Sequence, residues 1–137
     1  MVKAGEIYFN PCYEYPAGNI EDKLLVVLKT TSLPTDPVIL IPTTTNKSNY
    51  PYRDGCNKNK YIFYLKAKQD FFVNNTIIQI YILNGAKFAL QSQFDLSVKN
   101  KTIEHIGSLK SNTFQQLLDC IKSQKDDIDQ DTYALLF

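Results

Sequence analysis

The 137-residue sequence has no tryptophan, one methionine, one histidine and a single arginine among its 15 basic residues. It also has no run of about 18 apolar residues, the length that a transmembrane helix needs. The segment MVKAGEIYF at the start lacks the apolar block of a signal peptide. We therefore expect a cytoplasmic protein with no membrane partner.

Cysteine is scarce as well. Cys12, Cys56 and Cys120 are widely spaced, form no C-x-x-C pair and lie far in sequence from His105. This spacing predicts neither a zinc site nor a disulfide framework, and no metal or other cofactor is expected. Cys120 falls in an apolar helical pattern and is predicted to be a small core residue. A nucleophilic pair of Cys56 and His105 has no supporting local motif.

Charge of either sign is not in excess. The net charge is +1, and apolar residues make up 44% of the chain, enough for one hydrophobic core. This length and composition predict a single domain spanning residues 1–137. Because the overall charge gives no attraction to nucleic acid, a basic surface for such a partner must be local.

What the sequence does contain is a series of short β-forming segments separated by turn residues. Residues 46–60 form a long polar loop, which in a small domain is usually functional or mobile. Residues 11–22 read as another loop, and Asn84-Gly85 is typical of a hairpin turn. The predicted strands are 5–10, 23–30, 38–43, 61–66, 76–83, 86–94 and 101–109.

The pattern changes after residue 109. Phe114, Leu117, Leu118 and Ile121 have the spacing of an amphipathic helix, predicted near residues 112–124. Thr113 and Gln116 fit a capping box. The tail 126–137 is acidic and then apolar, so it forms either a last helical turn or a docking segment. The fold class is therefore mainly β, a small curled β-barrel of five to seven strands with a C-terminal helix.

Residues 39–46, ILIPTTTN, place three threonines at the end of an apolar strand. Threonine suits strand ends and also builds turns. A third interpretation is that the hydroxyls line a site. The residues alone leave the three interpretations open.

The ordered motifs GEIYF (5–9), LLVVL (24–28), VILIPTTT (38–45) and I-x-x-I-G-S-L-x-S (103–111) resemble the PemK/MazF family of bacterial toxin endoribonucleases. That family has a G-D/E-I start, an R-P-x-L-V-V strand, a strand ending P-hydrophobic-T-S, and an I-G-x-L-S strand before the last helix. The resemblance covers nearly the whole chain and implies an SH3-like barrel, a homodimer and cleavage of single-stranded RNA without metal. It also implies a cognate antitoxin-like protein as inhibitor.

Transferred residue by residue, the resemblance places Thr44 on the catalytic threonine and Thr45 on the following serine. It places Asp22 and Lys23 on the family's R-P, so the arginine is absent and Lys23 is the nearest cation. Thr44 and Lys23 are the predicted catalytic residues; Thr43, Thr45, Asp22 and Arg53 are the predicted substrate-binding residues. Arg53, in the 46–60 loop, is either a substitute for the missing arginine or an ordinary surface residue.

Tyrosines interleave with lysines in the middle of the chain. Tyr50, Tyr52, Tyr61 and Tyr64 lie near Lys58, Lys60 and Lys66. Such a pattern either stacks bases and neutralises phosphates, or reflects tyrosine packing in a barrel. Two functions follow: a toxin-type endoribonuclease, or a barrel that has lost catalysis and binds nucleic acid or protein.

Overall fold

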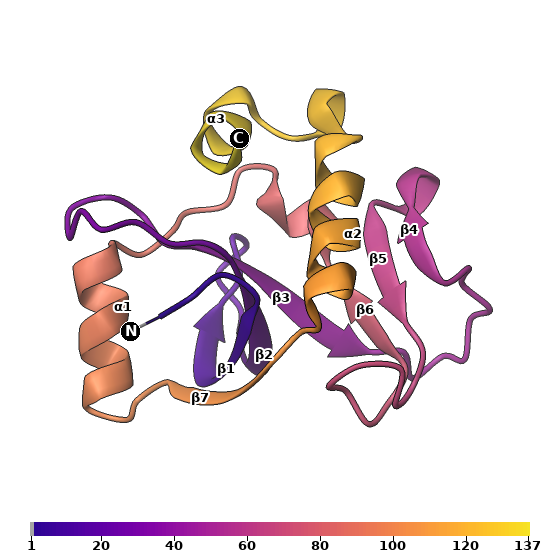
Figure 1. The fold of residues 1–137 in the computed structure, drawn as a ribbon, viewed down its shortest axis with the longest axis horizontal. Coiled ribbons are helices and arrows are strands. Elements are labelled where there is room, and N and C mark those ends of the chain that lie inside the picture. The colour runs from indigo at the N-terminus through magenta and orange to yellow at the C-terminus, as the bar shows by residue number, and fades with distance from the viewer. Residues whose placement is uncertain (1) are drawn as a thin grey trace.

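The computed structural model describes residues 2–137 as one antiparallel sheet with three α-helices (Figure 1). The seven strands have the order β4-β5-β6-β3-β2-β1-β7. The strands are β1 Glu6–Glu14, β2 Ile20–Lys29, β3 Ile39–Thr45, β4 Gly55–Asn57, β5 Ile62–Leu65, β6 Thr76–Ile78 and β7 Glu104–Ser108. The helices are α1 Gln91–Lys99, α2 Ser111–Lys122 and α3 Gln130–Leu136.

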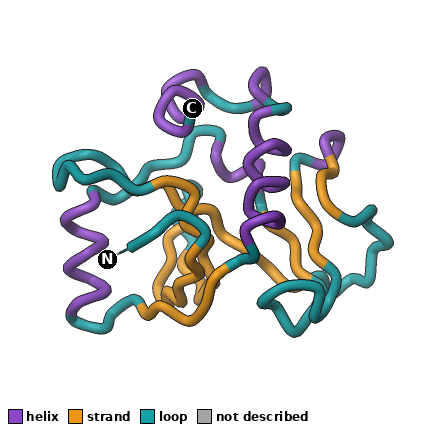
Figure 2. The backbone as a smooth tube through the Cα atoms, in the orientation of Figure 1, coloured by secondary structure: helices purple, strands orange, loops and turns teal. Residues whose placement is uncertain are grey.

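The mainly β prediction is confirmed. The sheet is open, because the edge strands β4 and β7 lie at opposite ends of the strand order. Strand β3 runs between two groups of strands, as Figures 1 and 2 show. One group is β1, β2 and β7 with α1 beside it, and the other is β4, β5 and β6 with α2 across it.

The predicted loop at residues 11–22 is wrong over most of its length. Strands β1 and β2 extend through it as a long hairpin, with pairing to Glu14↔Ile20. Pro11 and Cys12 are accommodated where the register shifts between Asn10 and Tyr13, since a bulge tolerates a residue without a backbone donor. The turn closes through a hydrogen bond from the Tyr15 N–H to the Asn19 carbonyl, 2.9 Å.

The hairpin predicted at Asn84-Gly85 is also wrong. Strand β6 ends at Ile78, and Ile80–Leu83 form a 3₁₀ turn. Gly85 has φ +76°, but the chain then leaves the sheet and forms α1 in place of a strand at 86–94. Phe94, the main apolar anchor of α1, is buried with its ring centroid 5.2 Å from that of Tyr8. This long-range contact outweighs the local turn signal.

The remaining strand predictions hold in position. Four more predicted segments coincide with or overlap an observed strand: 23–30 with β2, 38–43 with β3, 61–66 with β5 and 101–109 with β7. The predicted loop 46–60 contains the short edge strand β4 and a 3₁₀ turn at Lys58–Lys60. Strand β3 continues through all three threonines, so the hydroxyl run belongs to the strand.

Helix α2 matches the prediction of 112–124 to within two residues and closes the core. Leu117 and Ile121 are fully buried and pack with Phe63 and Ile78 from the sheet. The predicted capping box is not formed, because Lys110 takes the N-cap position. The amphipathic spacing, more than the cap, fixes this helix.

The tail folds back on its own chain. Residues 130–136 form α3, and Ile128 and Leu136 are buried in the same core as α2. The Asp129 carboxylate caps α3 by accepting from the Thr132 N–H, 3.0 Å. The tail therefore forms a last helix that contributes Leu136 to the core, while Leu135 and Phe137 stay exposed.

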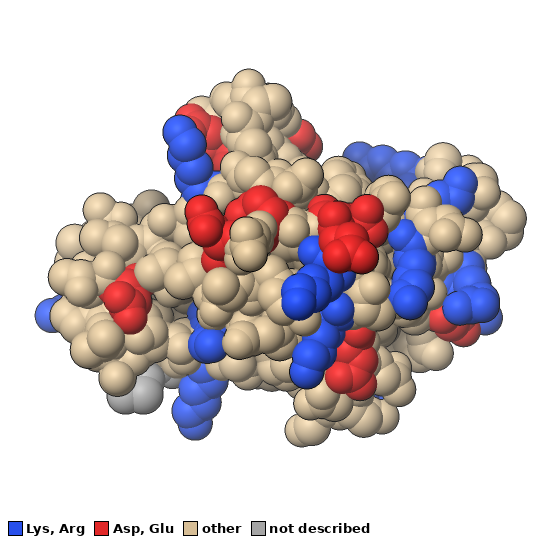
Figure 3. Space-filling view, turned by 90° about the horizontal axis from the view of Figure 1, so that it is seen from above, with Lys and Arg blue, Asp and Glu red and all other residues tan. Residues whose placement is uncertain are grey.

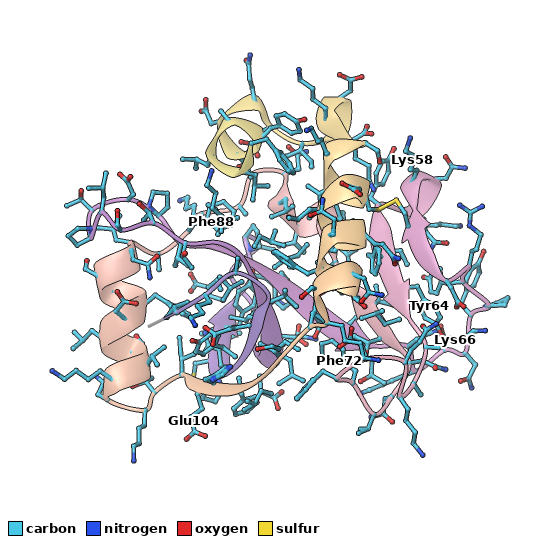
Figure 4. The ribbon with its side chains drawn as sticks, viewed as in Figure 1. Lys58, Tyr64, Lys66, Phe72, Phe88 and Glu104 are labelled. Atoms are coloured by element: carbon cyan, nitrogen blue, oxygen red, sulfur yellow. A yellow bond between two sulfur atoms is a disulfide. The ribbon has the colours of Figure 1, made fainter. Side chains whose placement is uncertain are left out.

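Two of the three cysteines form a disulfide, which corrects the prediction that none would. Cys56 of β4 and Cys120 of α2 are joined with a Cα–Cα distance of 5.4 Å, visible as the yellow bond beside α2 in Figure 4. Their sequence separation of 64 residues hid the pairing. Cys12 is free and exposed. Within residues 2–137, no helix has the length and apolar character to cross a membrane.

Candidate functional site

The candidate site is a notch where β2 and β3 separate. Their ladder ends at Leu25↔Pro42, after which residues 43–45 pair with β6 on the other side. Pro42 lacks the backbone donor that a continued ladder would use. A cavity of about 260 Å³ opens there. It is lined by Glu21, Asp22, Lys23, Leu24, Thr43, Thr44, Thr45, Lys47, Phe72 and Thr76.

Lys23 and Thr44 meet at this notch. The Lys23 ammonium donates to the Thr44 hydroxyl at 3.2 Å, although the two residues lie on different strands. The Lys23 side chain is only 12% exposed, and its Nζ lies 3.7 Å from the Glu21 carboxylate. It also lies 5.9 Å from the centroid of the Tyr15 ring. The cation is therefore held in place by groups on three sides.

The three threonines have three different environments. Thr43 is buried and donates its hydroxyl to the Leu24 carbonyl at 2.9 Å, which ties β3 to β2 where the ladder ends. Thr44 is half-buried and accepts from Lys23. Thr45 is exposed on the notch wall. The strand-end interpretation thus fits Thr43, and the site interpretation fits Thr44.

Of the predicted site residues, only Arg53 lies apart from the notch. Asp22 is exposed and lines the notch with Lys23 and the threonines. Arg53 is exposed in the segment before β4, where its carbonyl accepts from the Asn57 amide at 2.7 Å. The order of strands places β4 three positions away from β3. Arg53 therefore supplies no cation to the notch in this conformation.

Sequence reasoning missed the groups behind Lys23. The Tyr15 hydroxyl donates to Gln79 Oε1 at 3.1 Å, and Gln79 Nε2 donates to the Tyr81 hydroxyl at 2.7 Å. Burial and the nearby Glu21 carboxylate raise the pKa of Tyr15 to about 12. Tyr15 is therefore a neutral hydroxyl donor at physiological pH. The sequence held a signal for Glu21 alone, because its i, i+2 spacing from Lys23 places both side chains on one face of the strand.

Cys56 and His105, which no sequence motif links as a nucleophilic pair, lie far apart in the sheet. Cys56 is bonded to Cys120 on β4, at one end of the strand order, and His105 is on β7 at the other end. His105 Nε2 lies 3.2 Å from the Glu6 carboxylate. Across residues 2–137, no three His, Cys, Asp or Glu side chains are grouped so as to hold a metal ion.

The fold and site define a mainly β protein with a cation and a hydroxyl paired in a notch of an open sheet. Comparison with models of known protein families, with curated proteins and with solved structures found no match.

Proposed function

We propose that this protein is a PemK/MazF-like endoribonuclease that cleaves single-stranded RNA at the β2–β3 notch without a metal. The ordered motif resemblance supports the class. The observation that carries the proposal is the contact between Lys23 and Thr44, 3.2 Å apart. The resemblance assigns Thr44 to catalysis, and Lys23 is the cation next to the position where the family has its arginine. A cation beside a hydroxyl matches the needs of a phosphate group.

The chemistry is an internal transfer at phosphorus. A carboxylate of the notch, Glu21 or Asp22, removes the proton from a ribose 2′-OH, and the resulting oxygen attacks the adjacent phosphorus. The bond from phosphorus to the 5′ oxygen breaks, and that oxygen takes a proton from the Lys23 ammonium. The products are a 2′,3′-cyclic phosphate and a 5′-OH. Thr44 donates to a phosphate oxygen as charge develops on it.

One observation favours the second candidate, a barrel that binds RNA but does not cut it. Arginine grips two phosphate oxygens at once and stabilises the transition state better than lysine. In the notch, Asp22 stands where the resemblance expects that arginine, and Arg53 lies outside. Under this alternative, Lys23 and Thr44 hold the phosphate, and the protein acts as a nucleic-acid- or protein-binding module.

The finer fold, partner and compartment assignments belong to the same proposal. The SH3-like barrel is supported by the register shifts in β1 and β2, since bulges increase the curl of a sheet. The homodimer and the antitoxin-like inhibitor follow from the resemblance. If the protein is cytoplasmic, the disulfide between Cys56 and Cys120 is reduced or transient in the cell, because reducing compartments keep thiols free.

Charge on the surface supports a local phosphate site more than general attraction to nucleic acid. Basic and acidic side chains lie side by side on the face seen in Figure 3. With a net charge of +1, RNA affinity rests on a few cations near the notch. Binding should therefore show a shallow dependence on salt concentration.

The test is cleavage of an end-labelled single-stranded RNA by purified protein in EDTA. Wild type should yield 2′,3′-cyclic phosphate ends, and a DNA strand of the same base sequence, which lacks the attacking 2′-OH, should stay intact. Lys23→Ala should abolish cleavage, whereas the control Lys99→Ala, an exposed cation on α1, should not. RNA binding that depends on Lys23, without cleavage, selects the binding module. If the protein neither cuts nor binds RNA, the endoribonuclease and the RNA-binding module are both wrong, and only the protein-binding module is left.

A further inference from the structure

A second hollow, of about 490 Å³, lies between the 46–52 segment and β5. Its lining combines aromatic rings, amides and a lysine, which is the mixture that contacts nucleobases and phosphates. The residues that matter here are Asn46, Tyr50, Tyr52, Tyr64, Lys66 and Asn75. We call it the tyrosine pocket.

Three tyrosine rings form one wall of this pocket. The ring centroids of Tyr50 and Tyr52 are 4.5 Å apart, and those of Tyr52 and Tyr64 are 5.5 Å apart. Tyr64 is buried, whereas Tyr50 is 47% exposed. In Figure 4, Tyr64 and Lys66 lie together at the end of β5. The series therefore runs from the sheet surface out to solvent.

The segment that carries Tyr50 is held in place by hydrogen bonds. The Asn46 amide donates to the Tyr50 carbonyl at 2.9 Å, and the Ser48 hydroxyl donates to Asn46 Oδ1 at 3.1 Å. The Tyr52 N–H donates to the same Tyr50 carbonyl at 2.9 Å. Because the rings are ordered before a ligand arrives, less entropy is lost on binding.

Two cations flank the rings. Lys60 Nζ lies 5.3 Å from the Tyr50 ring centroid. The Lys66 side chain is 63% exposed and lies 3.4 Å from the Asp54 carboxylate. An exposed ion pair of this kind contributes little stability. Lys66 can therefore exchange Asp54 for a phosphate at small cost.

Paired residues on neighbouring strands lead from the notch to the tyrosine pocket. Thr44 pairs with Ile77, and Ile77 pairs with Tyr64, so the three side chains form a row on one face of the sheet. Two strand spacings separate Thr44 from Tyr64, about 10 Å. The opposite face carries Phe63 and Ile78, which pack against α2. The row is thus on the side of the sheet away from α2.

The ends of β3 and β6 connect the two hollows. Thr45 and Thr76 line the notch, and the residues next to them in the chain, Asn46 and Asn75, line the tyrosine pocket. The Asn46 N–H donates to the Asn75 carbonyl at 2.8 Å. A single extended ligand strand that crosses the sheet at this point would reach both the notch and the tyrosine pocket.

We propose that the tyrosine pocket binds a nucleobase of single-stranded RNA, by stacking against Tyr50 and Tyr52, while Lys66 contacts the adjoining phosphate. The proposal rests on the proposed function for the phosphate in the notch. The pocket is a base site for a nucleotide next to the one whose phosphate lies at Lys23. Stacking accepts every base, so the site selects single strands over duplexes more than it selects sequence.

The test is fluorescence anisotropy with a labelled oligouridylate octamer and, in parallel, a hairpin RNA without single-stranded ends. Tyr50→Ala should weaken octamer binding by between about fivefold and a hundredfold, the loss expected for one stacked base. Tyr50→Phe keeps the ring and should bind like wild type. Tyr61→Ala is the matched control, since Tyr61 is similarly exposed, at 40%, but lines a different cavity. Photocrosslinking of a 5-iodouracil octamer should label Tyr50 or Tyr52.

The outcomes separate the two proposals. If Tyr50→Ala binds the octamer like wild type while Lys23→Ala binds weakly, the base site is wrong and the notch stands; the pocket is then left for a protein partner. If Tyr50→Ala weakens binding while Lys23→Ala does not, the base site stands and the notch assignment is wrong. Equal loss with Tyr50→Phe and Tyr50→Ala, or labelling outside the pocket, overturns the stacking role.

Discussion

The disulfide between Cys56 and Cys120 can be removed with a single substitution, Cys56→Ala, which breaks the covalent link between β4 and α2. The remaining Cys120 is 3% exposed and stays in the core as a small apolar residue. A cross-link over 64 residues lowers the entropy of the unfolded chain. In the chain-entropy model the loss is about 4 kcal/mol.

For a chain of 137 residues, that free energy corresponds to a fall in melting temperature of about 14 °C. The assay is thermal unfolding followed by circular dichroism, on wild type and Cys56→Ala, each with and without reductant. Reductant should lower the melting temperature of wild type and leave that of Cys56→Ala unchanged. Cys12→Ala, which changes an exposed free cysteine, should melt like wild type.

A count of thiols in the unreduced, denatured protein checks the covalent bond itself. The disulfide predicts one reactive thiol, Cys12, for each wild-type chain. Three thiols, together with equal melting temperatures for wild type and Cys56→Ala, would refute the reasoning.

Three further substitutions test the fold and site. Gly107→Ala would place a Cβ closer to the Phe71 ring than van der Waals contact allows. It should therefore lower the free energy of unfolding, measured by urea titration, by about 1–3 kcal/mol. The double variant with Phe71→Leu should recover part of that lost stability. Burial alone would raise the pKa of Asp129, but hydrogen bonds from Gly85 and Thr132 outweigh it and lower this pKa. Asp129→Ala should therefore lower the free energy of unfolding by about 1 kcal/mol at neutral pH. In unfolding measurements at decreasing pH, the difference between wild type and variant should shrink as the pH falls below the ordinary aspartate pKa and through the lowered pKa of Asp129. A difference that stays constant with pH would contradict the capping role. Thr44→Val should leave the melting temperature unchanged and weaken RNA binding by about 0.5–1.5 kcal/mol, whereas the larger loss with Lys23→Ala should shrink at high salt.

Local patterns located the elements whose periodicity matches their packing. The spacing of Leu117 and Ile121 predicted α2 because those residues form its buried face. The hydroxyl run led to Thr44 because residues at a strand end are well placed to line a site. The motif order pointed to Lys23 as the cation nearest the missing arginine, and in the structure Lys23 and Thr44 lie within hydrogen-bond distance.

Features that depend on distant contacts were not predictable in this way. Residues 86–94 alternate as a strand would, yet α1 begins at Gln91, with Phe94 packed on Tyr8. The β1–β2 hairpin contains two prolines, which predicted a loop from the sequence. Pro11 lies at a bulge and Pro16 lies in the turn, so neither interrupts the pairing. Cys56 and Cys120 meet only because α2 packs against β4. Each of these outcomes depends on tertiary packing, which local propensity does not contain.

The most direct measurement of the central claim is the Lys23-dependence of RNA cleavage in EDTA. Purified wild-type protein, free of any inhibitor, should convert a single-stranded RNA to fragments with 2′,3′-cyclic phosphate ends, and Lys23→Ala protein of equal melting temperature should not. Cleavage by Lys23→Ala at the wild-type rate would contradict the assignment of the β2–β3 notch as the active site.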